Sequence, residues 1–592
     1  MRRARHGSAR AAGARRHRFL VATSVALALA MTAAVASART SATLATATSA
    51  AAAPAAVAAG SVGAEIQSLA NAGTLGELHW PDFADYKKSV IEFYNAGGWA
   101  PAWTDGGAPT PSALGMIDLF KQAGFKGLDS TDYDAGRWAA RLARLRTDAP
   151  NPPSAALARF DLALTVCAMR YISDLHIGRV NPRAVAFDLE VGAQKLNLAQ
   201  TLRDQFIHAP DVAAIITQVE PPYAGYQRLE AGLAHYLELT HREEPTLPLP
   251  SAPIHPGDAY AGIAQLATRL RLVGDLPADA SAPPGAARYQ GALVDAVRRY
   301  QRRHGLAPDG VLGKATVATM NVPLRVRVEQ LDFALERYRW MPPEFPEPPI
   351  VVNLPEFILR TMRRQPAPFL ETRVVVGKAY RHQTPVFTGM MRYVIFRPWW
   401  NVPYSITAGE LIPKILRDRG YLASHNYAIF NSAGRLVSDG VVNDAIMAGL
   451  HSGALNIRQK PGPKNALGLV KFMFPNSYNV YLHSTPAQEL FSRPRRDFSH
   501  GCIRVQKAAE LAAWVLRGMP EWTPDRIART MNGDRTVQVN LDRPIPVLIL
   551  YSTAVAESDD EVSFFDDIYG HDAELRRALA ARHAAHAAAA PA

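Results

Sequence analysis

The spacing of hydrophobic and polar positions changes along the chain and marks its parts. Between about residues 62 and 241, within an expected domain at 62–252, apolar residues recur every three or four positions, broken by Asp-Gly-Gly, Asn-Pro-Pro and Glu-Pro-Pro. This spacing predicts helices separated by turns. After Leu324 the apolar runs become short, β-branched and bounded by Pro and Gly, which is typical of strands. We therefore expect a multidomain α+β protein with a helical N-terminal domain.

Five of the later runs are expected to be strands of one β-rich domain at residues 323–571. They are Ile350–Leu354, Arg373–Gly377, Arg392–Phe396, Val470–Phe474 and Asn479–His483. Between the third and the fourth lies a long insertion, about 405–455, with a helix expected near 408–417. An insertion of this length in a compact domain is usually functional and often acts as a lid.

A compact unit at residues 257–322 follows a proline-rich linker, Glu244–Pro253. Helices are expected at 261–272, at 291–304 and just after Gly313. The stretch Ala296–Val317 resembles the small three-helix peptidoglycan-binding domain, because it matches AVxxFQxxxGLxxDGxxGxxT with Tyr300 in place of Phe. The resemblance implies binding of glycan or stem peptide; the alternative is a bundle that only spaces two domains.

The first 38 residues predict a secretory signal peptide. Seven arginines precede an uncharged apolar run, Phe19–Val35, and small residues follow at 36–38. The protein is therefore expected to be exported and periplasmic, or held at the inner membrane if the signal is not cleaved. Residues 39–61 are a low-complexity linker, and the Ala-rich tail, 572–592, is assigned no role. Removing the seven arginines lowers the net charge from +12 to +5, so no nucleic-acid partner is expected.

The two cysteines occur in different contexts and are not expected to pair. Cys167 lies in a stretch with apolar residues at helical spacing, where a lone Cys is usually a small core residue. Cys502 follows Gly501 in Phe498–Val505 and precedes a polar stretch. It is expected at a turn or at the end of an element, where reactive groups are exposed.

The residues around Cys502 suggest nucleophilic catalysis. Tyr481 and His483 fall on one face of a strand, and Cys502 and Arg504 share a face if Cys502–Val505 is extended. A thiolate attacks, and a nearby imidazole accepts the proton of the thiol. The carbonyl or the hydroxyl of Ser484 is expected to orient the His483 ring.

The remaining polar groups near Cys502 have several possible roles. The N–H groups of Gly501 and Cys502, with the Tyr481 hydroxyl, are candidate donors to an oxyanion. His500 is expected to bind substrate, to line the pocket or to make a structural hydrogen bond within the turn. Arg504 either clamps a carboxylate or pairs with a nearby Asp.

Together these residues resemble a known family. His483 with Ser499-His-Gly-Cys502 and Ile503-Arg504 is similar to the signature of the YkuD-type L,D-transpeptidases. Further motifs match the large subclass, which carries a scaffold domain and a peptidoglycan-binding domain: Ser173–Pro182, Leu335–Trp340, Thr384–Phe387, Trp400–Pro403, Arg458–Gly462, Asn465–Gly468 and Lys471–Asn476. Two features depart from it: His500 stands where members often have Ser, and Arg397-Pro-Trp-Trp replaces Asn-Pro-x-Trp.

The resemblance implies a β-sandwich catalytic domain that needs no cofactor and no metal. Cys502 would attack the bond between diaminopimelate and D-Ala of a tetrapeptide stem and pass the acyl group to the side-chain amine of another stem, giving a 3,3 cross-link. The insertion would exclude water. The substrate-binding residues implied are Arg504, His500, Ser499, Trp400 and Asn401. The partners implied are peptidoglycan stem peptides and glycan and other cell-wall synthesis enzymes, with carbapenem-type β-lactams as inhibitors.

Other readings of the same residues remain open. His483, His500 and Cys502 are metal-competent and also fit a zinc-dependent cell-wall peptidase or amidase, although no HExxH motif occurs. A papain-like hydrolase has its Cys before its His, the reverse of this order. A non-catalytic peptidoglycan-binding scaffold is the remaining alternative. The acceptor (a stem, a free D-amino acid or a lipoprotein lysine), the role of His500, regulation and the oligomeric state stay open.

Overall fold

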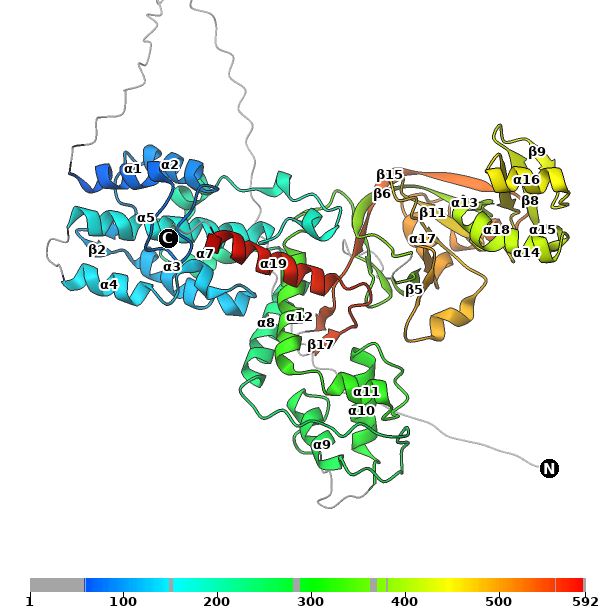
Figure 1. The fold of residues 1–592 in the computed structure, drawn as a ribbon, viewed down its shortest axis with the longest axis horizontal. Coiled ribbons are helices and arrows are strands. Elements are labelled where there is room, and N and C mark those ends of the chain that lie inside the picture. The colour runs from blue at the N-terminus through cyan, green and yellow to red at the C-terminus, as the bar shows by residue number, and fades with distance from the viewer. Residues whose placement is uncertain are drawn as a thin grey trace, which may run out of the picture. The chain divides into compact units, whose positions relative to one another are not determined.

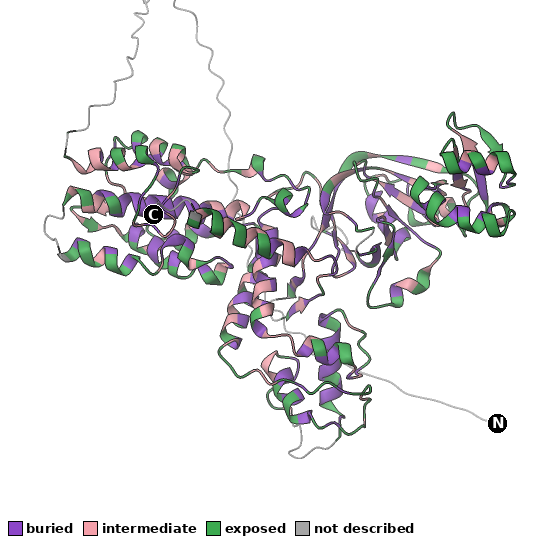
Figure 2. Cartoon of the chain, in the orientation of Figure 1, coloured by how far each residue is buried: buried purple, intermediate pink, exposed green. Residues whose placement is uncertain are grey.

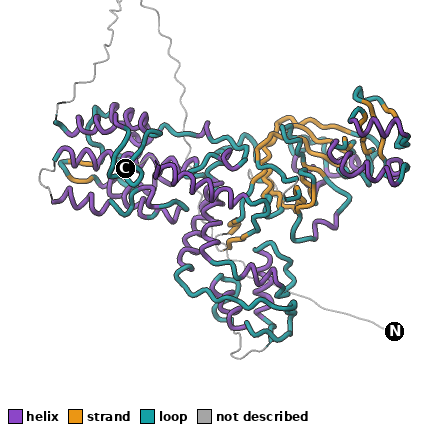
Figure 3. Tube along the Cα trace, viewed as in Figure 1, coloured by secondary structure: helices purple, strands orange, loops and turns teal. Residues whose placement is uncertain are grey.

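The computed structural model describes residues 58, 60–147, 153–280, 288–362, 370–379, 382–558 and 561–588. The predicted signal peptide, 1–38, and almost all of the linker at 39–61 lie outside these ranges. Within the described ranges, none of the helices combines the length and apolar character needed to cross a membrane. The chain has mixed helical and β content, with helices in the N-terminal part and strands gathered in the C-terminal part (Figure 3).

The N-terminal part is helical, as the spacing predicts (Figure 1). One helix, α5, is buried along most of its length because apolar residues lie on nearly every side of it, Cys167 among them (Figure 2). The elements are α1 (Val62–Ala72), α2 (Lys87–Ala96), a hairpin of β1 (Thr104–Asp105) and β2 (Ala108–Pro109), α3 (Pro111–Lys121), α4 (Trp138–Thr147), α5 (Ser154–Ile177), α6 (Leu198–Thr201), α7 (Val212–Val219) and α8 (Ala224–Leu239).

Three helices with their own core follow: α9 (Ile263–Leu272), α10 (Ala292–Arg303) and α11 (Lys314–Met320). The side chain of Gln301 explains the spacing of Gln301, Asp309 and Gly310 in this unit. Its Nε2 donates to Asp309 Oδ1 at 3.0 Å, and its Oε1 accepts from the N–H of Gly310 at 2.8 Å. Gly310 has φ +77°, which favours glycine. A helix glutamine thus holds the Asp-Gly turn.

The C-terminal part is built on a nine-stranded sheet in the order β13-β5-β14-β12-β11-β6-β15-β3-β4. The strands are β3 (Ile350–Asn353), β4 (Ile358–Thr361), β5 (Glu371–Gly377), β6 (Phe387–Phe396), β11 (Val470–Met473), β12 (Leu482–His483), β13 (Asp497–Ser499), β14 (Ile503–Val505) and β15 (Val537–Leu550). Between β14 and β15 the chain forms two helices, α17 (Ala508–Val515) and α18 (Pro524–Asn532).

The β-sandwich prediction is corrected by the strand pairing. Strand β4 also pairs with β5, so the eight strands from β5 to β4 close into a ring rather than forming two separate sheets. Closure leaves few unpaired edges, which explains why short strands suffice here. The inner residues form one core, with Val352, Val376 and Val547 among its members.

The insertion between β6 and β11 forms a subdomain, which we call the cap. Its core is separate from that of the nine-stranded sheet and includes Ile415, Ile429 and Ile457. Its sheet has the order β7-β10-β8-β9. The elements are β7 (Trp400–Asn401), α13 (Tyr404–Ile406), a π-helical turn (Thr407–Leu411), α14 (Ile412–Arg417), α15 (Tyr421–Ser424), β8 (Tyr427–Asn431), β9 (Leu436–Ser438), α16 (Asp444–Ser452) and β10 (Leu455–Gln459).

The hydrophobic cores cross the predicted domain boundaries of 62–252, 257–322 and 323–571. The segment from Val180 to Val191 belongs in sequence to the helical part but packs into the core of the nine-stranded sheet, where Asp188 forms a bridge with Phe387. In the other direction, α12 (Leu324–Tyr338) and the hairpin β16 (Ala554–Ser558) and β17 (Glu561–Phe564) pack against α8.

The predicted tail is a helix with partners. Helix α19 (His571–Ala588) contacts the helical part through an ion pair of 2.9 Å between Arg582 and Asp174 of α5 (Figure 1). At its start, Asp572 pairs with Arg337 of α12 at 2.6 Å. The C-terminal helix therefore contacts both the N-terminal helical part, through α5, and helix α12.

Candidate active site

A row of side chains crosses three neighbouring strands of the nine-stranded sheet. Lys471 of β11 lies opposite His483 of β12, and His483 lies opposite Arg504 of β14. The N–H of Ile503 donates to the Tyr481 carbonyl at 3.1 Å, which sets Tyr481 beside Cys502. Because side chains alternate along a strand, Tyr481 and Cys502 share the face of His483 and Arg504. The structure thus brings these four predicted residues together.

The strand that carries His483 is shorter than the predicted Asn479–His483. The side chain of Asn476 accepts hydrogen bonds from the N–H groups of Tyr478 (3.0 Å) and Val480 (3.1 Å) and donates to the Val480 carbonyl (2.8 Å). Asn479 has φ +54°. These bonds occupy backbone groups that a neighbouring strand would need, so β12 begins only at Leu482.

The His483 ring is buried and held by backbone. Its Nδ1 lies 2.6 Å from the Ser484 carbonyl, so Nδ1 carries the proton and Nε2 is the acceptor. Burial, with the neighbouring charges of Arg504 and Lys471, lowers the pKa of His483 to about 3. The carbonyl and the hydroxyl of Ser484 were both candidates to orient the ring, and the carbonyl is the group that contacts Nδ1. The Ser484 hydroxyl instead accepts from the N–H groups of Leu469 and Val470 at 2.7 and 3.1 Å.

The Cys502 thiol is half-buried and neutral at rest. Burial raises the pKa of the Cys502 thiol, and hydrogen bonds from Tyr481 together with the charges of Lys471 and Arg504 oppose that rise. The thiol lies 3.7 Å from the Asn479 carbonyl. Within the described ranges, no hydrogen bond joins Sγ to the His483 ring. Catalytic contacts of this kind are often loose before substrate binds and tighten afterwards.

The Tyr481 hydroxyl lies near both Cys502 and Trp400 of the cap. Burial raises the pKa of this hydroxyl, the Cys502 thiol raises it further, and the Trp400 side chain opposes the rise. Trp400 belongs to β7 and pairs with Gln459 of the cap sheet. Asn401, the next residue, is exposed and pairs with Arg458. The structure thus brings Trp400 into the site but leaves Asn401 on its periphery.

Two predicted roles in the turn before Cys502 are corrected. The N–H of Gly501, expected to bind an oxyanion, donates to Ser499 Oγ at 3.1 Å. Ser499, expected to bind substrate, is buried beneath the turn and donates to the Cys502 carbonyl at 2.5 Å. The turn uses these groups to close on itself, so neither is free. Among the described residues the Cys502 N–H has no such partner.

The side chain of Thr384 also holds the turn before Cys502. Thr384 Oγ1 donates to the Gly501 carbonyl at 2.8 Å and accepts from the N–H of Gly377 at 2.9 Å. Gly501 itself has φ +113°, where a side chain would be strained. Thr384 therefore fixes the turn that presents Cys502. In the sequence Thr384 stands out only as part of a motif, because its contact with Gly501 spans 117 positions.

His500 contacts the cap rather than the turn. Its Nε2 lies 2.6 Å from Glu410 Oε1, in the π-helical turn of the cap, and its ring lies 4.8 Å from that of His382. Both side chains of the pair are exposed, 39% and 45% respectively. The His500–Glu410 pair therefore joins the turn before Cys502 to the cap at the surface, a contact that was not among the predicted roles of His500.

Arg504 and Lys471 are the cations of the site. Burial lowers the pKa of each, and an ionised Cys502 would raise it. The Nε of Arg504 is buried without a hydrogen-bond partner, and no carboxylate in the described ranges forms an ion pair with Arg504. Lys471 was not singled out from the sequence. Only the pairing of β11 with β12 places Lys471 beside His483, and this pairing cannot be read from the sequence.

Comparison with known proteins agrees with this geometry. A family model described as "L,D-transpeptidase catalytic domain" matches residues 348–527, the part that holds every residue of the site. Residues 348–527 of the chain are thus similar to an L,D-transpeptidase catalytic domain. Models described as "Scaffold domain" and "Putative peptidoglycan binding domain" match residues 88–233 and 260–320 of the same chain.

A curated relative points the same way. A protein of Haemophilus influenzae named "Putative L,D-transpeptidase" is 34% identical over 229 residues. That match covers 39% of this chain and 45% of the relative, so the chain matches less than half of the relative's length. The recognition of an L,D-transpeptidase domain with a scaffold and a peptidoglycan-binding domain is thereby confirmed.

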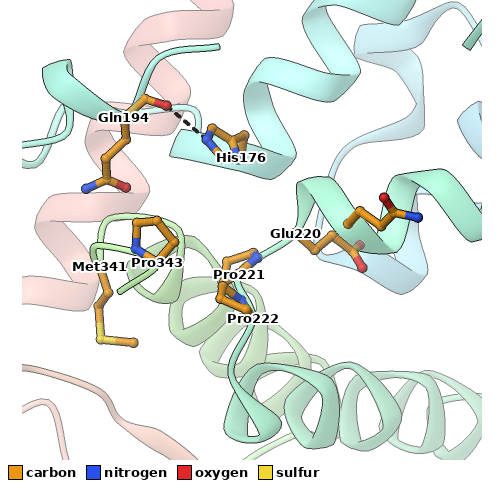
Figure 4. Close-up of a pocket in the computed structure, with 8 residues that line it drawn as sticks. His176, Gln194, Glu220, Pro221, Pro222, Met341 and Pro343 are labelled. Atoms are coloured by element: carbon orange, nitrogen blue, oxygen red, sulfur yellow. Dashed lines mark hydrogen bonds between the residues drawn. The ribbon is translucent and has the colours of Figure 1, made fainter. Parts of the chain in front are cut away.

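A cavity elsewhere in the described part of the chain is lined by none of the candidate site residues. It has a volume of about 100 Å³ and is lined by residues of α5, the α7–α8 turn and the segment after α12, among them His176, Glu220 and Met341 (Figure 4). The two ring nitrogens of His176 lie 2.7 and 2.9 Å from the carbonyls of Val219 and Gln194. These contacts tie helices together, so this cavity does not mark the site of the chemistry.

Proposed function

We propose that this protein is a peptidoglycan L,D-transpeptidase in which Cys502 carries the acyl group. The observation that supports this most is the single polar face formed by Tyr481, His483, Cys502 and Arg504 inside the transpeptidase domain. The peptidoglycan-binding domain supports peptidoglycan as the substrate. The proposal includes export by residues 1–38 to the periplasm.

The first half of the reaction forms a thioester. Sγ of Cys502 attacks the carbonyl carbon of the L-centre of diaminopimelate in a tetrapeptide stem. The thiol proton passes to His483 Nε2 and then to the amine of D-Ala, which leaves as the C–N bond breaks. Because the thiol and the imidazole both rest neutral, proton transfer accompanies formation of the S–C bond rather than preceding it.

The oxyanion formed in this step needs donors that are already in place. In our proposal these are the Cys502 N–H and the Tyr481 hydroxyl, since the Gly501 N–H is bound by Ser499. The unpartnered Nε of Arg504 supports a role for this side chain in binding a carboxylate of the stem.

The second half transfers the acyl group. The side-chain amine of a second stem attacks the thioester carbonyl, its proton goes to His483, and the C–S bond breaks to regenerate the thiol. The product has a 3,3 cross-link. Water competes with the amine, and the cap, in contact through Trp400 and His500, would limit its access. The same thiol would be acylated by carbapenem-type β-lactams.

The test is mass spectrometry of products from a disaccharide tetrapeptide. The wild-type protein is expected to release D-Ala and to form a dimer joined through two third-position residues. Cys502→Ala should do neither, whereas Cys167→Ala, which removes the other, fully buried cysteine, should retain both activities. Equal product from Cys502→Ala would refute the proposal.

A further inference from the structure

Lys471 stands at the end of the row that crosses the site. It lies directly opposite His483 on the neighbouring strand and is half-buried. Through the described part of the chain, no aspartate or glutamate forms an ion pair with it. A half-buried ammonium without a carboxylate is costly unless another group compensates it. Lys471 therefore needs a partner of another kind.

That partner is the ring of Tyr481. The Lys471 Nζ lies 3.7 Å from the centroid of this ring, within the range of a cation–π contact. The same side chain lies beside Cys502, because the N–H of Ile503 donates to the Tyr481 carbonyl at 3.1 Å, and Tyr481 favours ionisation of the Cys502 thiol. The ammonium, the ring and the thiol thus follow one another from β11 to Cys502.

This series acts on the thiol in two ways. An ammonium above the ring withdraws electron density, which makes the phenol a stronger hydrogen-bond donor to sulfur. The ammonium also places a positive charge near Sγ, and thiolates form more readily beside cations. Burial opposes ionisation of Cys502, so a favourable charge from outside the turn is needed.

We propose that Lys471 is a positioning residue for the nucleophile: it holds the Tyr481 ring against Cys502 and provides the positive charge that favours the thiolate. The importance of Lys471 for catalysis rests on the proposed function. The ionisation of the thiol can be measured without any transpeptidation. Arg504, on the other side of His483, is a second cation whose charge acts on the same thiol.

The test is the pH dependence of alkylation of the full-length protein by iodoacetamide. Cys167 has no exposed surface, so Cys502 is the thiol that reacts, and Cys502→Ala gives the blank. Lys471→Met is expected to raise the apparent pKa of alkylation by about one unit and to slow the reaction near neutral pH about tenfold. Lys471→Arg should restore most of the rate because it keeps the charge.

The matched control is Lys507→Met. Lys507 is exposed and donates to the Glu371 carbonyl, so its removal takes away one charge without touching the Tyr481 ring. Its alkylation profile should equal that of the wild type. Should Lys471→Met fail to fold, Lys471→Gln carries the same expectation in the same assay.

A second pair of variants separates the ring from the charge. Tyr481→Phe keeps a ring for the ammonium but removes the hydroxyl, and it should also raise the apparent pKa of alkylation. If Lys471 acts through Tyr481, the double variant should shift this pKa by less than the sum of the single shifts. An unchanged alkylation profile in folded Lys471→Met or Lys471→Gln overturns the inference, whatever the peptide assay shows about acyl transfer.

Discussion

The two sides of the site are built differently. On the sheet side, His483 is almost fully buried, paired through its strand and held by the Ser484 carbonyl at 2.6 Å. On the cap side, His500 and Glu410 are exposed and meet only through their side chains. Backbone register fixes the sheet side, whereas a contact between two exposed side chains is weak and adjustable. In the proposed function, the bond chemistry lies on the sheet side and the cap controls water access.

Replacing His483 should have the largest effect on activity. His483→Gln removes the proton acceptor while keeping a polar side chain, and a general base is worth about 10²–10⁴ in rate. Release of D-Ala from a tetrapeptide, measured by mass spectrometry, should fall by that factor. His500→Gln, the matched change on the cap side, should leave D-Ala release within a few-fold of wild type. Similar losses in both variants would remove the contrast between the two sides.

A glycine behind His483 gives the second prediction. Gly468 has φ +62°, and a Cβ there would lie 2.2 Å from Ser484 Oγ. Gly468→Ala must displace Ser484, whose carbonyl holds His483, and should lower the free energy of unfolding by about 2–4 kcal/mol. It should also lower D-Ala release. Urea denaturation measures the first effect.

The control for that change lies six residues earlier. A Cβ on Gly462 would meet nothing within 4 Å, so Gly462→Ala should change the free energy of unfolding by less than about 0.5 kcal/mol. Equal costs for the two alanines would show that the Gly468–Ser484 contact does not support the site.

Acid should weaken the fold through His483. The pKa of His483 is about 3 in the folded protein and about 6.5 when unfolded, so between these values the unfolded chain binds a proton that the folded chain does not. Stability contributed by this group is full above about pH 6.5 and falls by about 1.4 kcal/mol per pH unit below it. Urea denaturation of wild type and His483→Gln from pH 4 to 7 should show that the free energy of unfolding depends less steeply on pH in the variant. An equal pH dependence in the two proteins would contradict a buried, neutral His483.

The cap side should give the smallest effect. A contact between two exposed side chains of this kind is worth at most about 1 kcal/mol, so Glu410→Gln should raise the ratio of hydrolysed to cross-linked product by no more than about fivefold. The control is Asp444→Asn, which removes a cap carboxylate that is 97% exposed and distant in sequence from the nucleophile turn. A ratio unchanged by Glu410→Gln would show that the His500 contact does not hold the cap.

Much of the sheet side could be predicted from sequence because its signals are local. Alternation along a strand was enough to group Tyr481 with His483 and Cys502 with Arg504. Lys471 was missed because a lysine in a strand ordinarily faces solvent, and its place beside His483 depends on strand pairing. The Gly501 N–H was assigned wrongly, since nothing in the sequence shows that Ser499 folds back beneath the turn.

The larger-scale errors have a common physical reason. The tail that forms α19 has no broad apolar face, so its attachment through Arg582 and Asp174 could not be foreseen. The segment Val180–Val191 and the strand pairing of β4 with β5 depend equally on contacts between distant positions. Periodicity predicts which elements form, but not which distant partners complete their cores.

The most direct test of the account is the mass of the intact protein after incubation with a tetrapeptide stem and an acid quench. The account predicts a covalent adduct equal to the stem without its D-Ala, located by digestion on the peptide that contains Cys502 and absent from Cys502→Ala. Release of D-Ala by Cys502→Ala at the wild-type rate, or an adduct on another residue, would contradict it.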